Sequence, residues 1–278
     1  MDHFKRSVVW ITGGGSGIGR ALALRFAHEG ADVVVSGRRV SKLDEVVSTI
    51  EAQGGRALAV PCDVCDVAAV RAAVRSVVER FGRLDVAVAN AGVGVTGAFT
   101  ALSDADWRRQ FDVNVFGLAN AAREAIPELQ KTKGRLVLVG SVSGMMGAPG
   151  TSAYTASKFA VRGLGLTLAQ ELYGTGVSCT LVHPGFVATD ISRVDNDGTF
   201  HPDRPDTRPS VLLWTPDHAA KVVLRAIARR DLEYVFTAHG KLGALLGKHA
   251  MRLVHLAMTR FRPAAVNATL KGKHPPGE

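Results

Sequence analysis

Runs of valine, isoleucine, leucine and alanine alternate along the chain with segments whose apolar residues recur every three or four positions. The first pattern predicts buried strands and the second predicts amphipathic helices. Seven strands are expected, at 8–12, 32–36, 56–61, 84–89, 135–140, 177–182 and 234–237. Six helices lie between them, at 17–29, 41–52, 67–81, 104–130, 152–173 and 216–230. This alternation predicts β-α-β units and a parallel sheet.

Several predicted strands are apolar at every position, as in 33–35 and 136–139, rather than at alternate positions. A strand of this kind has both faces buried, which occurs when helices cover both sides of a parallel sheet. We therefore predict a doubly wound α/β domain over residues 1–238. Right-handed crossovers place the loops after the strands at one edge of such a sheet, where ligands bind.

One segment, 190–215, breaks this alternation because it is rich in proline, aspartate and arginine and shows no clear periodicity. Long irregular insertions in a folded domain are usually functional. We interpret the segment as a lid over the substrate site. The alternative is an ordinary surface loop.

A glycine-rich loop follows the first predicted strand and leads into a helix, with the sequence Thr12-Gly13-Gly14-Gly15-Ser16-Gly17-Ile18-Gly19. Glycine lets a backbone turn tightly and approach a pyrophosphate, and the N–H groups at a helix N-terminus favour negative charge. By itself the loop could be only a tight turn. Its place between a strand and a helix indicates a dinucleotide-binding site.

The spacing T-G-x-x-x-G-x-G in this loop resembles that of the short-chain dehydrogenase/reductase family, and the resemblance extends over about residues 7–237. It implies a Rossmann fold with seven strands in the order 3-2-1-4-5-6-7. The residues of the loop that the resemblance assigns to the cofactor are Gly13, Ser16, Gly17, Ile18 and Gly19.

The second strand leads into Ser36-Gly37-Arg38-Arg39, which bears on the choice between NAD and NADP. An acidic residue there would bind the ribose 2′-hydroxyl of NAD, whereas arginine accommodates the 2′-phosphate of NADP. Gly37 has no carboxylate to repel a phosphate, and Arg38 and Arg39 can hold it through charge-assisted hydrogen bonds. We therefore predict NADP(H) as the cofactor. The alternative is that both arginines lie in a solvated turn.

The resemblance assigns further cofactor contacts to the loops after later strands. After the third strand, the residues that match the adenine contact are Asp63 and Val64. After the fourth, those that support the cofactor are Asn90, Ala91 and Gly92. After the sixth, those that match the nicotinamide-lining segment are Pro184, Gly185 and Thr189. We interpret His183, just before them, as structural.

Tyr154 and Lys158 lie four residues apart, on one face of the predicted helix that follows the fifth strand. A nearby ammonium group and the positive nicotinamide of an oxidised cofactor favour the phenolate form. We expect both to move the pKa of Tyr154 down toward working pH, so that it can exchange a proton with a carbonyl or alcohol oxygen. A tyrosine and a lysine at this spacing are common by chance. Whether this pair is catalytic therefore depends on further matching residues.

The resemblance supplies those partners. Ser141, thirteen residues before Tyr154, matches the family's serine, whose hydroxyl would polarise the substrate oxygen. Ser143 is a nearby competitor that we expect to shape the substrate pocket instead. Asn114 matches the helix asparagine that connects the lysine to solvent through a water in relatives.

Together these residues predict an oxidoreductase that moves a hydride between nicotinamide and a carbonyl or alcohol. Tyr154 would act as the acid and base, Ser141 would stabilise the oxygen, Lys158 would tune the tyrosine and hold ribose, and Asn114 would relay protons. The alternative is a catalytically silent NADP(H)-binding sensor or interaction protein of the same fold.

The composition fits this interpretation, since 46% of the 278 residues are hydrophobic and 21% are charged. We find neither a run of about 18 apolar residues nor a secretory signal pattern, and expect a cytoplasmic protein. Cys62, Cys65 and Cys179 are too few for a disulfide framework. The first two form a C-x-x-C pair without a second pair, so we predict no metal site.

The formal net charge of +9 raises the question of a nucleic-acid partner. Seven lysine or arginine residues and one acid lie within 239–278, so this segment carries most of the charge. The main domain is not unusually basic. Because no nucleic-acid motif accompanies the basic segment, we expect no nucleic-acid partner.

The segment 241–262 has the pattern of an amphipathic helix that Pro263 ends, within a C-terminal extension of residues 239–278. Its apolar face consists of Leu242, Leu245, Leu246, Ala250, Leu253, Val254, Ala257, Met258 and Phe261. Its basic face consists of Lys241, Lys248, Arg252, His255 and Arg262. We expect this face to pack on the domain, to cover the substrate cleft or to contact a second subunit, and we favour these over peripheral contact with an anionic membrane. Gly243 and Gly247 weaken the helix in isolation.

The predicted walls of the substrate pocket are apolar, with Val93, Val95, Phe99, Met145, Met146, Phe186 and Trp214. We therefore expect a lipophilic ketone, aldehyde, steroid or long-chain alcohol as the substrate. The resemblance implies a homodimer or homotetramer joined through the helices near 104–130 and 152–173.

Overall fold

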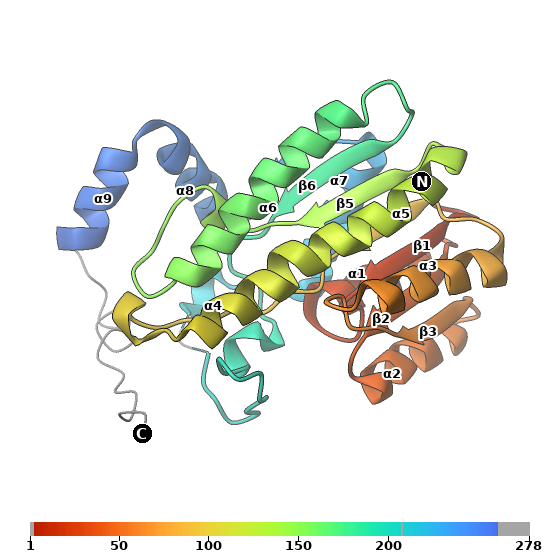
Figure 1. Ribbon diagram of the computed structural model, residues 1–278, viewed down its shortest axis with the longest axis horizontal. Helices are drawn as coiled ribbons and strands as arrows, with labels where there is room; N and C mark the ends of the chain where they lie inside the picture. The colour runs from red at the N-terminus through yellow and green to blue at the C-terminus, as the bar shows by residue number, and fades with distance from the viewer. Residues whose placement is uncertain (1–2, 207, 261–278) are drawn as a thin grey trace.

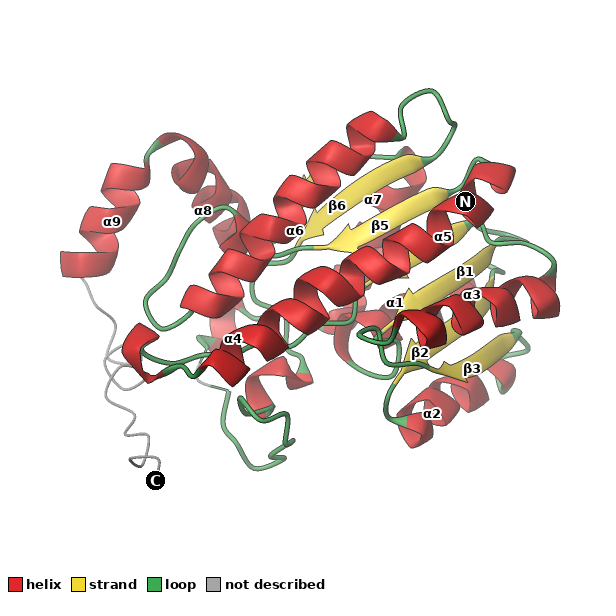
Figure 2. Cartoon of the chain, in the orientation of Figure 1, coloured by secondary structure: helices red, strands yellow, loops and turns green. Residues whose placement is uncertain are grey.

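The computed structural model describes residues 3–206 and 208–260, and within these residues the strands form one parallel sheet. Its order is β3-β2-β1-β4-β5-β6-β7 (Figures 1 and 2), which confirms the predicted order. The strands are β1 (Val8–Thr12), β2 (Asp32–Gly37), β3 (Ala57–Pro61), β4 (Val86–Ala89), β5 (Arg135–Val139), β6 (Ser178–His183) and β7 (Glu233–Val235).

Helices cover both faces of this sheet, as the uninterrupted apolar strands predict (Figure 1). One face carries α1 (Gly17–His28), α2 (Val40–Glu51) and α7 (Pro216–Arg229). The opposite face carries α3 (Val67–Phe81), α5 (Leu118–Thr132) and α6 (Ser152–Glu171). Alternate residues of each strand point to opposite faces, so Val9 and Ile11 pack on the first side while Val8 and Trp10 pack on the second.

Local sequence signals set where several helices begin. Asp66 accepts hydrogen bonds from the backbone N–H groups of Ala68 and Ala69 and so caps α3. Ser103 and Asp106 form a capping box at the start of α4 (Asp104–Phe111). These starts match the predicted ones closely because the capping chemistry is local.

The predicted helix at 104–130 is interrupted in the structure. A π-helical turn at Asp112–Gly117 separates α4 from α5. Within this turn the Asn114 side chain accepts a hydrogen bond from Val93 N–H at 2.8 Å and donates one to Val93 O at 3.0 Å. π turns of this kind frequently mark functional sites, and a helical periodicity does not reveal them.

The segment 190–215 contains short structure that the sequence pattern did not predict. It holds two 3-10 turns, at Asp190–Arg193 and Ser210–Leu212, and an antiparallel bridge between Val194 and Phe200. The Asp195 side chain accepts hydrogen bonds from the N–H groups of Asp197 and Thr199, which stabilises the turn between the bridged residues.

The C-terminal extension forms two helices, α8 (Ala238–His249) and α9 (Met251–Arg260), not the single predicted helix. The break lies at Ala250, whose φ of −139° is not helical. The last strand ends earlier than predicted because Thr237, at φ +72°, turns the chain and caps α8 through Gly240 N–H. Phe261, Arg262 and Pro263 lie outside the described residues.

The two glycines of α8 have a structural role that their low helix propensity hides. A Cβ at Gly243 would lie 2.9 Å from Sδ of Met146, and one at Gly247 would overlap the backbone of Met145. Both glycines therefore let α8 approach the loop after β5. Figure 1 shows α9 farther from the sheet, and Leu253 and Leu256 on it are exposed. Among the described helices, none is long and apolar enough to cross a membrane.

Asp85, just before β4, is a buried carboxylate that joins two strands. It accepts a hydrogen bond from Val8 N–H at 2.8 Å and a bidentate pair from the Arg83 guanidinium at 2.7 and 2.8 Å. We predict that Asp85→Ala lowers the free energy of unfolding by about 2–3 kcal/mol, because a buried N–H at the start of β1 loses its acceptor. Urea denaturation measures this change.

Asp231→Ala is the matched control, since it removes an exposed ion pair with Arg229. We expect it to change stability by less than about 1 kcal/mol. Equal effects of the two substitutions would contradict the assigned role of Asp85.

Candidate active site

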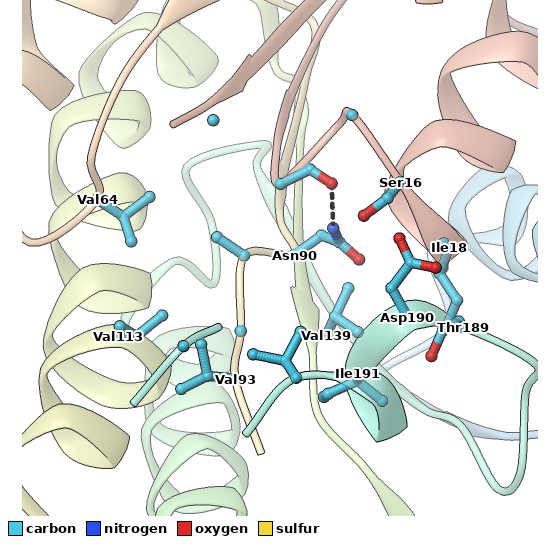
Figure 3. Close-up of a pocket in the computed structure, with 18 of the residues that line it drawn as sticks. Ser16, Ile18, Val64, Asn90, Val93, Val113, Val139, Thr189, Asp190 and Ile191 are labelled. Carbon is cyan, nitrogen blue, oxygen red and sulfur yellow. Dashed lines mark hydrogen bonds between the residues drawn. The ribbon is translucent and has the colours of Figure 1, made fainter. Parts of the chain in front are cut away.

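A cavity of about 640 Å³ lies at the carboxyl ends of the parallel strands. Residues that follow each of the strands β1 to β6 line it (Figure 3). Figure 3 shows Ser16 and Ile18 on the same side of the cavity as Thr189 and Asp190, with Val64 and Val113 across from them. The parallel sheet thus brings together loops that lie far apart in the sequence.

The glycine-rich loop is held against the loop after β4. The Asn90 amide donates hydrogen bonds to the carbonyl oxygens of Thr12 and Gly13, at 2.9 and 3.2 Å. Gly13 has a φ of +64°, and a Cβ there would lie 2.9 Å from Cα of Ala91. A side chain at this position would be both strained and obstructed. The predicted residues Asn90, Ala91 and Gly92 therefore lie directly beside the loop and line the cavity.

The N-terminus of α1 faces the cavity with an uncapped first turn. Ser16, at the N-cap position, makes no side-chain hydrogen bond to the helix. The first N–H groups of α1 are therefore free of a side-chain cap, as an anion site at a helix N-terminus requires. Gly17 has a φ of +54° and lies against Thr189, which brings a residue after β6 to the same place.

Arg38 and Arg39 both line the cavity, and Arg39 lies beside this helix N-terminus. The Arg39 guanidinium donates a 2.8 Å hydrogen bond to Oγ of Ser16 and lies 4.0 Å from a carboxylate oxygen of Asp190. Asp63 and Val64 line the cavity after β3, and Asp63 accepts a hydrogen bond from Cys65 N–H. Uncapped N–H groups, a glycine turn and guanidinium groups together fit the phosphates of a dinucleotide.

Ser141, Tyr154 and Lys158, which come after β5 and from α6, line the same cavity. Lys158 is buried and its Nζ donates a 3.0 Å hydrogen bond to Val139 O. The same Nζ lies 5.8 Å from the centre of the Tyr154 ring. Oγ of Ser141 accepts a hydrogen bond from Ser143 N–H at 3.1 Å, which orients the hydroxyl. Ser143 is absent from the described cavity lining.

Burial shifts the pKa of both ionisable groups. It lowers the pKa of Lys158 to about 8. It raises the pKa of Tyr154, although a hydrogen bond with Ser141 and the charge of Arg208 act in the opposite direction. Among the chain's own groups, burial outweighs the expected lowering because it penalises the phenolate more than its neighbours favour it. The lowering expected from an oxidised nicotinamide stays a prediction.

The Asn114 side chain contacts residues that neighbour the predicted reacting groups. Its amide holds the backbone of Val93 and lies 3.3 Å from Oγ of Ser157, which in turn donates to Tyr154 O at 2.7 Å. A Cβ at Gly92 would lie 3.2 Å from the Asn114 amide oxygen. The side chain thus braces the loop after β4 against α6, and its predicted proton relay stays a prediction.

The cavity wall differs from the predicted apolar wall. Seven residues were predicted to form this wall. Of these seven, only Val93 belongs to the described cavity lining. Val95 and Met145 are buried elsewhere, Phe99 is exposed, and Trp214 packs against Phe236. The wall instead includes the apolar residues Val113, Ile191, Val194 and Phe200 and the charged residues Arg109 and Arg208.

Sequence reasoning missed these residues because their approach depends on how 190–215 folds. Its composition identified the segment but not its contacts. One signal could have indicated Arg109. It lies five residues before Asn114, on the helix that leads to this predicted site residue.

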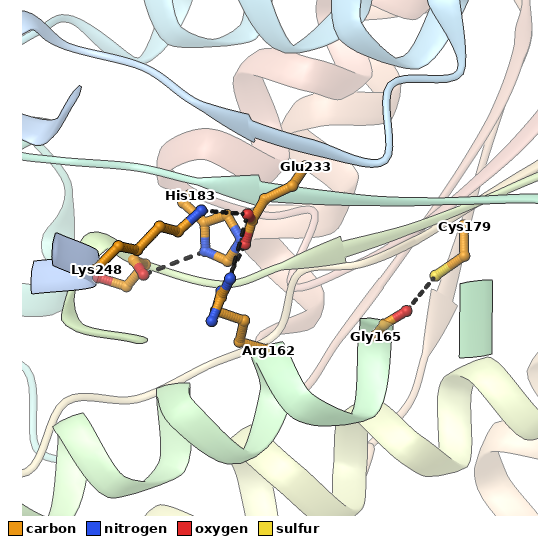
Figure 4. Close-up of polar contacts among 7 residues, drawn as sticks. Arg162, Gly165, Cys179, His183, Glu233 and Lys248 are labelled. Carbon is orange, nitrogen blue, oxygen red and sulfur yellow. Dashed lines mark hydrogen bonds and ion pairs between the residues drawn. The ribbon is translucent and has the colours of Figure 1, made fainter. Parts of the chain in front are cut away.

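A partly buried ionic cluster around His183 contacts the backbone of Ser141 (Figure 4). Nδ1 of His183 lies 3.2 Å from Ser141 O, and its Nε2 lies 3.1 Å from the carboxylate of Glu233. Arg162 on α6 and Lys248 on α8 also bind that carboxylate, at 2.6 and 2.7 Å. His183, with Arg162 and Lys248, holds the pKa of Glu233 far below its usual range. This cluster connects α8 to the backbone of Ser141.

The cysteine pair has no metal-binding surroundings among the described residues. No group of three or more potential ligands occurs there. Cys62 lines the cavity and Cys65 is exposed, and burial raises the pKa of each thiol to about 11. Both cysteines are therefore poor nucleophiles at neutral pH.

The fold and the cavity define a nucleotide-binding α/β protein, and comparisons with known proteins identify its family. The family model for short chain dehydrogenases matches residues 7–199. The chain is 39% identical over 193 residues to a 3beta-hydroxysteroid dehydrogenase of Mediterraneibacter gnavus, covering 69% of this chain and 70% of that protein. The chain therefore belongs to the short-chain dehydrogenase/reductase family.

Solved structures agree with this assignment. A short chain dehydrogenase from Burkholderia cenocepacia in complex with NADP is 31% identical, with a TM-score of 0.75 over 86% of this chain and 98% of that one. A family member from Burkholderia phymatum in complex with NAD is 28% identical, with a TM-score of 0.76 over the full length of both chains. The protein is thus an oxidoreductase of a family that uses nicotinamide dinucleotides.

The buried Lys158 leads to a prediction about stability. Below pH 8 the folded protein carries a buried ammonium group, whose burial opposes folding. Between pH 8 and about 10.4, the unfolded chain keeps a proton that the folded chain has released, so this group makes stability rise with pH. We predict that Lys158→Met raises the free energy of unfolding at pH 7 by about 1–3 kcal/mol, partly offset by the lost hydrogen bond to Val139 O.

Urea denaturation at pH 7, 8, 9 and 10 measures both effects, and the variant should lack this part of the rise above pH 8. Lys131→Met, which removes an exposed ion pair with Glu128, serves as the control. A less stable Lys158 variant with an unchanged pH dependence would contradict the prediction.

Proposed function

We propose that the protein is an NADP(H)-dependent oxidoreductase that interconverts a lipophilic carbonyl compound and the corresponding alcohol. One observation carries the proposal. Ser141, Tyr154 and Lys158 line the same cavity as the glycine-rich loop and Arg39. A cofactor along this cavity would have its phosphates at the helix N-terminus and its reactive ring near the tyrosine.

The residues that would hold the dinucleotide follow the strands in order. The backbone of Gly13 to Gly19 would bind the pyrophosphate, and Asp63 and Val64 would contact the adenine. The nicotinamide end would lie against the residues Asn90, Ala91, Gly92, Pro184, Gly185 and Thr189. When bound, the nicotinamide supplies or accepts the hydride.

Side chains of the protein donate the proton and stabilise the charge that develops on the substrate oxygen. In the reductive direction the Tyr154 hydroxyl donates a proton to the substrate oxygen, and the raised pKa of this group suits a donor at neutral pH. The Ser141 hydroxyl donates a hydrogen bond to the same oxygen and stabilises charge as it develops. Lys158, fixed to Val139 O, holds its ammonium beside the tyrosine and the ribose site. Asn114 would connect this lysine to solvent.

Two observations support NADP(H) over NAD(H). No carboxylate occupies the end of β2, where Gly37 precedes Arg38 and Arg39. Arg39 already hydrogen-bonds Ser16 at the helix N-terminus, so its guanidinium is within reach of a phosphate there. Charge-assisted hydrogen bonds to a 2′-phosphate would favour NADP.

A lipophilic substrate is supported by the apolar side chains of Val113, Ile191, Val194 and Phe200 in the cavity. The relative from M. gnavus is named for a hydroxysteroid. We propose further that residues 1–238 form the catalytic domain and that the segment 190–215 acts as a lid over the substrate. Helix α8 packs on this domain. A cytoplasmic homodimer or homotetramer completes the proposal.

The tyrosine gives the most direct test of the catalytic assignment. We predict that Tyr154→Phe lowers kcat for ketone reduction by about 10²–10⁴-fold, because the proton donor is lost. Binding of NADPH, measured by tryptophan fluorescence, should stay within about twofold, because the phosphate contacts lie elsewhere.

Tyr173→Phe alters an exposed tyrosine near the end of α6 and should leave both quantities unchanged. Near-native turnover by the Tyr154 variant would refute the assignment. A wild-type protein that binds NADPH tightly but reduces no carbonyl would favour the catalytically silent alternative.

The cofactor preference depends on the arginines after β2. We expect Arg39→Ala to raise the Kd for NADPH by about 10-fold or more, since hydrogen bonds to charged groups contribute about 1.5–3 kcal/mol. The Kd for NADH should not change, because NADH lacks the 2′-phosphate. Isothermal titration of both cofactors measures the difference.

Arg75→Ala on α3 is exposed and controls for the change in net charge. An Arg39 variant that keeps the wild-type ratio of NADPH to NADH affinity would show that this side chain does not read the phosphate.

A further inference from the structure

Two guanidinium groups belong to the cavity wall, although the predicted substrate wall was wholly apolar. Arg109 comes from α4 and Arg208 from the segment 190–215, and both line the cavity together with Ser141 and Tyr154. They are distinct from Arg38 and Arg39, which follow β2 beside the glycine-rich loop. Among the described residues, the cavity is therefore lined by four arginines, two of which lie outside the predicted cofactor site.

Arg109 is half-buried and has no carboxylate partner within the described part of the chain. Its Nη1 donates a long hydrogen bond of 3.4 Å to Asp195 O. Gly198, at φ +94°, lies directly against the guanidinium, and a Cβ there would overlap it. The turn between Val194 and Phe200 thus confines the arginine at the cavity wall. A half-buried guanidinium without a counter-ion favours binding of an anion.

Arg208 is held in a defined orientation. Its Nε and Nη2 donate to the Asp206 carboxylate at 2.8 and 2.6 Å, and Nη2 lies 3.4 Å from Oγ of Ser192. These bonds use the Nε and Nη2 groups, and Nη1 has no hydrogen-bond partner among the described residues. The charge of Arg208 opposes the burial-driven rise in the pKa of Tyr154, and both residues line the same cavity. A pre-oriented donor near Tyr154 can bind a charged substrate group at little entropic cost.

We propose that the substrate carries an anionic oxygen group, a carboxylate or a phosphate, which Arg109 and Arg208 bind in this cavity. The inference rests on the proposed function, because it names the substrate class of the same site. The apolar body of the substrate packs against Ile191 and Phe200, and its carbonyl meets Ser141 and Tyr154. The substrate is therefore amphiphilic, with an apolar body and a charged end.

Matched pairs of ketones test the charge alone. 4-Acetylbenzoate and 4-acetylbenzamide have the same carbonyl and nearly the same shape, and 6-oxoheptanoate with 6-oxoheptanamide provides a flexible pair. 4-Acetylphenylphosphonate distinguishes a phosphate-like group from a carboxylate. NADPH oxidation by the full-length protein gives kcat and KM for each compound. We expect kcat/KM to be at least about 10-fold higher for the anion than for the amide in one pair or more, as bidentate ion pairing predicts.

Arg109→Met and Arg208→Met should each lower this preference at least about fivefold, mainly through KM for the anion. The ratio of the two substrates is the readout, because any effect of Arg208 on Tyr154 acts on both alike. Arg108→Met and Arg193→Met are the controls, since both side chains are exposed and absent from the described cavity lining. They should keep the wild-type ratio.

Three results would overturn the inference while leaving the proposed function intact. The wild-type protein could reduce amides as well as anions in both pairs. The preference could persist in both methionine variants. The variants could instead weaken NADPH binding about 10-fold, which would assign the arginines to the cofactor.

A protein that reduces none of these ketones would count against the proposed function, and binding then decides the inference. Thermal shift of the NADPH complex with 4-acetylbenzoate is the readout. Stabilisation that Arg109→Met abolishes and Arg108→Met preserves supports the anion site. Absence of stabilisation overturns it.

Discussion

Parallel pairing of the strands is the constraint on which the site depends. Because β1 to β6 all end at the same edge, residues from six loops line one cavity, although they span the sequence from Gly13 to Arg208. The pairing is stabilised by residues that take no part in the site, such as Asp85, which joins the starts of β1 and β4. Asn90 and Asn114 then hold the loops in place through hydrogen bonds to backbone groups.

Three sets of ionisable side chains line the cavity. Arg38 and Arg39, with the N-terminus of α1, provide positive potential. Buried Lys158 and partly buried Tyr154 form the second set, and removal from water shifts both groups toward their neutral forms. Arg109 and Arg208 add further positive charge to the cavity wall. The active site therefore keeps charges that oppose folding, a common exchange of stability for function.

Much of the fold follows from local signals in the sequence. Uninterrupted apolar strands predict the two-sided helical layers, and capping residues such as Asp66 set helix starts. The glycine-rich loop, Ser141, Tyr154 and Lys158 were also identifiable, because their spacing reflects the chemistry of a cofactor and a proton donor. The structure brings them into one cavity.

Features that arise from long-range packing were not predictable in the same way. The π turn around Asn114 depends on contacts with Val93, and the break at Ala250 depends on how α8 meets the loop after β5. The burial that raises the pKa of Tyr154 was not predictable either, because it is a property of the folded chain. Likewise, Arg109 lines the cavity through a turn that the composition of 190–215 does not specify.

Transfer of deuterium from the cofactor tests the central claim most directly. The purified protein would be incubated with NADPH deuterated at nicotinamide C4, on each face in turn, and with a panel of lipophilic ketones. Mass spectrometry then locates the label. We predict an alcohol with one deuterium on the carbinol carbon, from one of the two labelled faces. Binding of NADPH without deuterium in any alcohol would contradict it.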